Sequence, residues 1–191
     1  MGIIFSLAGS KAVGKSTLIE GLRQEIPQLI IREGFRKANT GFNLNIENEY
    51  YENERWYINR EIKEFYKLKK CEDPVLLLRG PEDLEFFALH YPKTRNYNWN
   101  VEKNLSEELK VLRACRSDYI LYLDASLNTI LKRKESDITK ARKNMDNWLK
   151  NWQPYIEPYI KNIDYTTVLN TENYDAKKVL ELAKKWIMEK I

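Results

Sequence analysis

The sequence predicts an α/β fold built on a five-stranded parallel sheet with helices on both faces. Short, mostly apolar runs alternate with longer segments of helical periodicity, and the first four runs stop at glycine or charged residues. Strands that alternate with helices are joined by crossovers, which makes the strands parallel and buries both faces of the sheet. The predicted strands are residues 2–8, 29–31, 75–78, 119–123 and 166–169.

The helices are indicated by apolar residues that recur every three or four positions. In the first helix Leu18 and Leu22 share one face, and Pro27 stops the segment. Pro154 and Pro158 interrupt a later apolar stripe, so a kinked or broken helix is expected over residues 148–159. The other predicted helices are residues 15–25, 46–70, 81–91, 101–112 and 176–187, and the long predicted loops are residues 34–45 and 92–100.

Length and composition fit a single domain over residues 1–191. The chain is 43% hydrophobic and 31% charged, which is enough apolar material for a core. Its 32 Lys and Arg against 28 Asp and Glu give a net charge of +4, a mild excess that suits small anionic ligands as well as nucleic acid. Because the excess is mild, a nucleic-acid partner is the weaker expectation. With no secretory signal and no run near the roughly 18 apolar residues of a membrane helix, we expect a cytoplasmic protein without a membrane partner.

The two cysteines carry no chemistry that the sequence can show. Cys71 and Cys115 lie far apart and belong to no CxxC or Cys/His cluster. We therefore expect two reduced thiols rather than a disulfide framework or a zinc site.

The most informative motif is the segment GSKAVGKS at residues 9–16. It matches GxxxxGK[ST] in full, directly after a predicted strand and at the start of a predicted helix. Glycines let backbone N–H groups turn towards phosphate oxygens, Lys15 would reach the β and γ phosphates, and the Ser16 hydroxyl would ligate Mg²⁺. A glycine turn without a ligand is the weaker alternative, because pattern and context agree. The sequence therefore predicts a P-loop NTPase fold whose nucleotide-binding residues are Gly9, Ser10, Lys11, Ala12, Val13, Gly14, Lys15, Ser16 and Thr17.

Two further observations narrow the class of P-loop protein. No Asn-Lys-x-Asp guanine motif is present, which argues against a GTPase. Residues 31–34, Ile-Arg-Glu-Gly, end the second predicted strand and look like the Arg-Glu-Pro-Gly segment of thymidylate kinases, with Gly34 in place of the proline. The chain thus resembles the thymidylate kinase and deoxynucleoside kinase group over nearly its whole length. The resemblance implies that Glu33 is the base for the acceptor hydroxyl, whereas a solvated charge pair at a strand end is the alternative.

The segment after the third predicted strand matches this group only in part. The group usually carries Asp-Arg or Glu-Arg there; Arg79 matches the arginine, and Leu78 replaces the acid. In the family that acid helps to hold Mg²⁺ or the attacking oxygen. The departure leaves this role open or moves it to Glu82 or Asp83, which could instead be first-turn carboxylates that complement a helix dipole.

Basic residues follow the fourth predicted strand, where these kinases carry an arginine-bearing lid, here about residues 133–143. Between residues 126 and 162 there are eight Lys or Arg against four Asp or Glu. Arg133 and Arg142 are the candidates to neutralise the phosphoryl group in transit, and a solvated basic helix face is the alternative. Residues 170–173, after the fifth strand, lie where such kinases hold the nucleotide base.

Together, motif and resemblance predict a P-loop kinase that uses ATP and Mg²⁺ to phosphorylate a small acceptor, a nucleoside or a nucleotide. Two alternatives stay open: a phosphotransferase for another small molecule, and a nucleotide-binding module without an acceptor. Homodimers are common in the group that the chain resembles, so the resemblance also implies that this protein could form a homodimer. The candidate catalytic residues are Lys15, Glu33, Arg79, Arg133 and Arg142, and the candidate metal ligand is Ser16.

Overall fold

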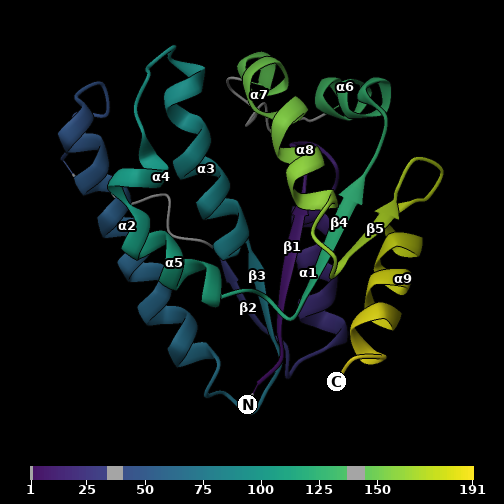
Figure 1. Ribbon diagram of the computed structural model, residues 1–191. Coiled ribbons are helices and arrows are strands. Elements are labelled where there is room, and N and C mark those ends of the chain that lie inside the picture. The colour runs from purple at the N-terminus through teal and green to yellow at the C-terminus, as the bar shows by residue number, and fades with distance from the viewer. Residues whose placement is uncertain (1, 34–40, 137–144) are drawn as a thin grey trace.

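The computed structural model describes residues 2–33, 41–136 and 145–191, and Figure 1 shows their arrangement around a central sheet. The five strands are all parallel, in the order β2-β3-β1-β4-β5. This confirms the predicted fold class, and each predicted strand lies within two residues of the observed one. The strands are β1 (Ile4–Gly9), β2 (Ile30–Glu33), β3 (Val75–Leu78), β4 (Tyr119–Asp124) and β5 (Thr166–Asn170).

Alternate side chains of β1 explain why helices cover both faces of the sheet. Phe5 and Leu7 pack with residues of α1 (Lys15–Glu25) and α9 (Ala176–Met188). Ile4 and Ala8 point the other way, where Ile4 packs with α2 (Glu47–Leu68) and Ala8 with α3 (Pro81–Thr94) and α8 (Gln153–Lys161). Figure 1 shows α1 and α9 on one side of the sheet and α2 and α3 on the other. A strand buried on both faces has to be mostly apolar, and the polar side chain within β1, that of Ser6, is buried in hydrogen-bond contact with the Ser117 hydroxyl at 2.7 Å.

The helix α3 continues past Pro92, where the sequence predicted a loop. A proline inside a helix offers no N–H to the carbonyl four residues earlier, here that of Ala88. The Tyr50 hydroxyl, from α2, donates to the Ala88 oxygen at 2.5 Å and replaces the missing donor. A tertiary contact thus stabilises a helix end that local sequence rules would place earlier.

The positions of the other helices agree with those predicted from the sequence, but some of the predicted helices are divided into two. The predicted helix of residues 101–112 is divided at Leu105 into α4 (Val101–Asn104) and α5 (Ser106–Ala114). The stripe over residues 148–159 is broken at Trp152, as expected, between α7 (Met145–Asn151) and α8. A short helix, α6 (Leu127–Glu135), follows β4. Within the part of the chain that the structure describes, no helix combines the length and the apolar character needed to cross a bilayer.

The carboxyl ends of all five strands lie at the upper edge of the sheet in Figure 1. In open α/β sheets ligands bind at this edge, outside the carboxyl ends of the strands. The glycine-rich loop after β1, Glu33 at the end of β2 and Arg79 just after β3 therefore share one end of the molecule.

Candidate active site

The glycine-rich loop joins β1 to α1 in a conformation that requires its glycines. Gly9 and Gly14 have φ angles of 133° and 109°, in the left-handed region, and a Cβ atom on Gly9 would lie 2.5 Å from the Leu123 carbonyl oxygen. The Lys15 ammonium donates to the carbonyl oxygens of Gly9 at 2.8 Å and Ser10 at 2.7 Å. The loop therefore curls around the lysine side chain.

A cavity of about 30 Å³ opens beside this loop, between β1, α3 and α8. Its charged lining residues are Lys11, Lys15, Arg79 and Asp83. Burial lowers the pKa of the Lys11 ammonium, and the nearby Arg79 lowers it further. Among the described residues, three cations thus line this loop cavity together with one carboxylate, which makes it suited to a polyphosphate.

The turn after β3 places Arg79 and Asp83 at this cavity. Arg79 has a φ of 70°, and Gly80 is packed so closely that a Cβ atom there would lie 2.1 Å from Ser6 Oγ. Only glycine fits at that position, and α3 begins directly after it. The turn thereby brings the first turn of α3 up against β1.

The two acids at the start of α3, Glu82 and Asp83, point in different directions and have different surroundings. Glu82 is 1% exposed and accepts hydrogen bonds from the backbone N–H of Ser117 at 2.7 Å and from its hydroxyl at 3.2 Å. Burial raises the pKa of Glu82. Asp83 lines the loop cavity. Of the two residues that could take over the role lost at Leu78, only Asp83 faces the loop.

On the other side of Arg79 lies a smaller cavity, of about 10 Å³, between α2 and the ends of β2 and β3. Arg32, which lines it, forms an ion pair with Glu64. Glu33 is exposed at the end of β2 and also lines this acid-lined cavity. Arg79 borders both cavities and so connects the glycine-rich loop to Glu33.

Glu61 is a residue of the acid-lined cavity that the sequence interpretation missed. It is 7% exposed, and within the described residues no hydrogen-bond or ion-pair partner of its carboxylate is found. Burial raises its pKa to about 7; Arg32 opposes the shift, and the acids Glu82, Glu64 and Asp83 add to it. The sequence does contain a signal for this residue. Glu61 follows Ile58 by three positions, so the helical period places its carboxylate on the buried face of α2.

Stability should depend on pH through Glu61. Because its pKa is higher in the folded than in the unfolded chain, stability falls as the pH rises from about 4.5 to about 7. We expect Glu61→Gln to be more stable than the wild type at pH 8 by up to about 3 kcal/mol, and equally stable at pH 4. Urea unfolding at both pH values measures this. A stability difference that is the same at both pH values would contradict it.

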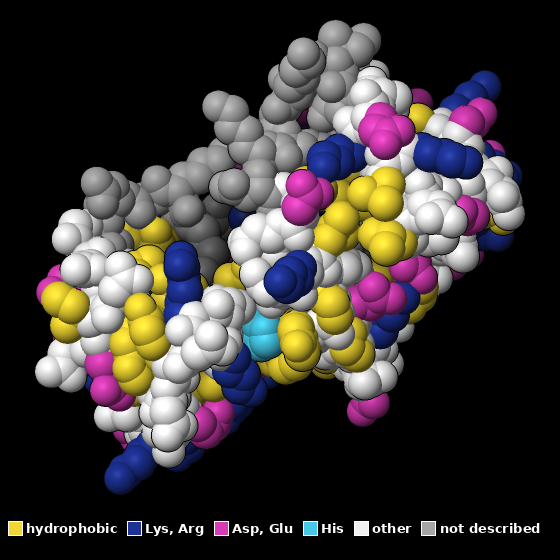
Figure 2. Space-filling view, turned by 90° about the horizontal axis from the view of Figure 1, so that it is seen from above, with side chains coloured by type: hydrophobic (Ala, Val, Ile, Leu, Met, Phe, Trp, Pro, Cys, Tyr) yellow, Lys and Arg dark blue, Asp and Glu magenta, His cyan; other side chains and the backbone are white. Residues whose placement is uncertain are grey.

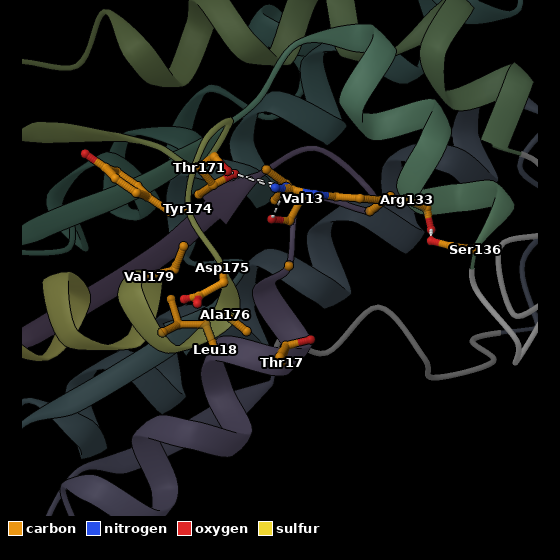
Figure 3. Close-up of a pocket in the computed structure, with 12 residues that line it drawn as sticks. Val13, Thr17, Leu18, Arg133, Ser136, Thr171, Tyr174, Asp175, Ala176 and Val179 are labelled. Carbon is orange, nitrogen blue, oxygen red and sulfur yellow. Dashed lines mark hydrogen bonds between the residues drawn. The ribbon is translucent and has the colours of Figure 1, made fainter.

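The largest of these cavities, about 390 Å³, lies on the far side of the glycine-rich loop and is bounded by α1, α6 and the start of α9. Figure 3 shows Arg133 reaching from α6 across it. The Arg133 guanidinium donates to the Val13 oxygen at 3.2 Å and to Thr171 at its carbonyl oxygen (2.8 Å) and Oγ1 (3.0 Å). The described residues that line it are Ala12, Val13, Gly14, Thr17, Leu18, Arg133, Ser136, Thr171, Tyr174, Asp175, Ala176 and Val179.

The loop between β5 and α9 is fastened to α6 at two points. Glu172 accepts hydrogen bonds from the N–H and hydroxyl of Ser126 and from the hydroxyl of Thr129, at 2.6 to 2.8 Å, which lowers its pKa to about 2. Arg133 holds Thr171 further along the helix. Its size, a lining that mixes apolar and polar side chains, and a common border with the glycine-rich loop make this cavity suited to a nucleobase. Thr171, which lines it, belongs to residues 170–173, where the resemblance implies the base site.

Arg133 is therefore placed in the wall of the base-sized cavity, whereas Lys15 lines the loop cavity. We expect Arg133→Ala to raise the KM for the nucleotide donor about tenfold while kcat changes less, because its contacts hold the binding loop in every step. Steady-state kinetics with the donor varied measure this, with Arg133→Lys as the conservative partner. A fall in kcat at unchanged KM would instead support the role at the transferring phosphoryl group.

The remaining predicted residues are placed as follows. Ser16 is exposed in the first turn of α1, and Thr17 lines the base-sized cavity. Arg142 and most of the predicted lid lie outside the described residues. His90 is 7% exposed and stacks on Phe86 with 5.0 Å between ring centroids. Burial lowers the His90 pKa, and the residue belongs to the packing between α3 and α8.

Comparison with known proteins finds similarity in structure but none in sequence. No family model matches the sequence, and no curated protein matches it at the level of sequence. Among solved structures, a deoxyadenosine kinase from M. mycoides with dCMP and dCDP bound is similar, with a TM-score of 0.66 and 17% identity, covering 98% of this chain and 100% of that chain. A thymidylate kinase from Candida albicans has a TM-score of 0.59 and 14% identity, covering 98% of this chain and 92% of that chain.

A third neighbour, the YorR protein from Bacillus subtilis in complex with phosphorylated GDP, has a TM-score of 0.56 and 17% identity, covering 97% of this chain and 95% of that chain. The similarity extends over nearly the whole chain in each case, as the sequence resemblance indicated. The parallel sheet in the order 2-3-1-4-5 with helices on both faces is thus the P-loop kinase fold seen in the deoxyadenosine kinase and the thymidylate kinase.

Proposed function

We propose that the protein is a kinase that transfers the γ-phosphate of ATP to a nucleoside or nucleotide. The observation that carries the proposal is the position of Arg79, which borders both the loop cavity and the acid-lined cavity. A phosphate held by the glycine-rich loop and an acceptor held beside Glu33 would meet at this one guanidinium. The fold shared with nucleoside and nucleotide kinases supports the proposal.

Each group at the site has a role in such a reaction. Lys15 and the amides of the loop would hold the β and γ phosphates, and the base-sized cavity beside Arg133 would take the adenine. The acceptor oxygen forms a bond to the γ phosphorus while the bond to the β–γ bridging oxygen breaks and ADP leaves. The proton of an acceptor hydroxyl would pass to Glu33.

The site also fits a magnesium ion. Mg²⁺ is usually bound through one or two carboxylates together with substrate phosphates rather than by a cage of protein ligands. Within the described residues no group of three His, Cys, Asp or Glu forms such a cage. The exposed hydroxyl of Ser16 and the carboxylate of Asp83 at the loop cavity are the residues that would hold the ion. When bound, it would neutralise charge on the phosphate oxygens.

A pooled acceptor assay tests the proposal. ADP formation from ATP and Mg²⁺ is measured with no acceptor, with pooled nucleosides, with pooled nucleoside monophosphates and with pooled sugars and amino alcohols. Stimulation by either of the first two pools, with a phosphorylated product seen by mass spectrometry, is the expected result. Stimulation by the last pool alone would indicate another small-molecule kinase. Binding of ATP without stimulation by any pool would indicate a binding module.

The face of the molecule shown in Figure 2 does not favour a nucleic-acid-binding module. On the part of the face in Figure 2 that the structure describes, Lys and Arg side chains are interspersed with Asp and Glu side chains. A protein that binds nucleic acid through its phosphates gathers its cations into a patch or stripe.

A further inference from the structure

We propose that Glu172 is a positioning residue for the nucleotide donor, because its carboxylate holds the loop between β5 and α9 against the start of α6. Through this contact Glu172 keeps one wall of the base-sized cavity in place and does not touch the nucleotide itself. The inference rests on the proposed function in one respect, namely that the base-sized cavity receives the base of the donor.

The neighbours of Glu172 line the cavity, whereas Glu172 turns away from it. Thr171, Tyr174 and Asp175 are among the described residues that line the cavity, and Glu172 is not one of them. Its side chain points to α6 instead, where its carboxylate meets three hydrogen-bond donors. A change at Glu172 therefore acts on the wall of the cavity without removing a group from its surface.

Both oxygens of the Glu172 carboxylate take part in this contact. Oε2 accepts from the backbone N–H of Ser126 at 2.7 Å, and Oε1 accepts from the hydroxyls of Ser126 at 2.8 Å and Thr129 at 2.6 Å. These hydrogen bonds, that from Thr129 first, lower the pKa of Glu172 to about 2, so the carboxylate is charged at neutral pH. Hydrogen bonds to an ionised acceptor are stronger than those between neutral groups. The contact thus fixes the direction of the loop as well as its distance from α6.

The start of α6 has no acid of its own, which gives the Glu172 carboxylate a second effect. The first turn of α6 carries no acidic side chain, whereas its last turn carries the basic residues Lys132, Arg133 and Lys134. The N-terminus of a helix bears a partial positive charge that a carboxylate stabilises. Here the carboxylate comes from a residue that is 46 positions from Ser126 in the sequence. The loop and the start of α6 therefore stabilise each other.

The other end of α6 holds the residue that precedes Glu172. Arg133 donates to the Thr171 carbonyl oxygen at 2.8 Å and to its Oγ1 at 3.0 Å, as Figure 3 shows. Two consecutive loop residues are thus held by opposite ends of one helix. Removal of the Glu172 carboxylate would leave the Thr171 contacts in place, so the loop would loosen rather than detach. Binding of a nucleotide would then have to order the loop, which lowers affinity.

Binding of ADP, measured by calorimetry, tests the inference without any turnover. We expect Glu172→Ala to raise the Kd for ADP about tenfold, because binding must then also order the loop. Glu181→Ala is the matched control, since Glu181 lies on α9 with 65% of its side chain exposed, and it should bind ADP as the wild type does. A wild-type Kd in Glu172→Ala would overturn the inference and leave the proposed function intact. A wild type that binds no nucleotide would contradict the proposed function and, with it, this inference.

A double-mutant cycle tests whether Glu172 acts through α6. Thr129→Val removes one of the three donors and should raise the Kd for ADP about threefold. Glu172→Ala combined with Thr129→Val should bind ADP no more weakly than Glu172→Ala alone, because the contact is already lost. Thermal unfolding without nucleotide checks that each variant is folded. Additive losses would show that the two residues act independently and would overturn the positioning role.

Steady-state kinetics separate positioning of the donor from a general loss of structure. In Glu172→Ala the KM for ATP should rise about tenfold, while kcat and the KM for the acceptor stay within about twofold of the wild type. The donor is affected alone because Glu172 supports only the wall of the base-sized cavity. A comparable fall in kcat, or a rise in both KM values, would indicate a purely structural role and contradict the inference.

Discussion

The variant Lys15→Ala is expected to lose phosphoryl transfer almost entirely, with kcat reduced by about 10³-fold or more. In the structure the Lys15 ammonium bridges the carbonyl oxygens of Gly9 and Ser10, at the centre of the loop. On binding of ATP it would exchange these partners for phosphate oxygens, on which negative charge must be stabilised during transfer. No other residue of the loop places an ammonium at that point.

Turnover of ATP in the presence of the best acceptor measures the effect, and the rise in melting temperature caused by ADP reports binding separately. Lys11→Ala is the matched comparison, because Lys11 lines the same cavity but contacts the Trp148 ring, at 5.2 Å from its centroid. Its effect should be smaller. If Lys15→Ala keeps more than about a tenth of the wild-type kcat, the glycine-rich loop does not hold the transferred phosphate.

The second large effect is expected for Glu33→Gln, which should lower kcat by about 10² to 10⁴-fold with little change in the KM for the acceptor. Glutamine keeps the size of the side chain and removes its ability to take a proton. Glu33 lies at the carboxyl end of β2, in the wall of the cavity that Arg79 shares with the loop. The expected loss therefore falls on the chemical step.

Glu64→Gln provides the control, since Glu64 lines the same cavity but is paired with Arg32. Single-turnover measurements separate the chemical step from product release. A wild-type rate for Glu33→Gln in such an experiment would transfer the role of base to another carboxylate of the cavity. A matching loss in Glu61→Gln would then identify that residue.

Much of the fold could be predicted because its signals are local. The mostly apolar run of β1 is what burial on both faces requires, and α1 follows from the spacing of Leu18 and Leu22. The glycine-rich loop is a contiguous motif, so its residues are together in space because they are together in the sequence. The order of the strands and the continuation of α3 past Pro92 depend on distant partners such as Tyr50.

In the candidate site, too, some features are encoded locally and others depend on contacts between distant segments. By itself the sequence determined the α/β class, the loop with Lys15 and the location of Glu33 and Arg79 after their strands. Only the tertiary structure decided that Asp83, and not its neighbour Glu82, faces the loop, because adjacent helical residues point about 100° apart and the turn at Gly80 sets the rotation of α3. It alone brought Arg133 to Val13, 120 residues away, and Glu61 to Glu33. Such contacts arise from crossovers between elements, and no local periodicity encodes them.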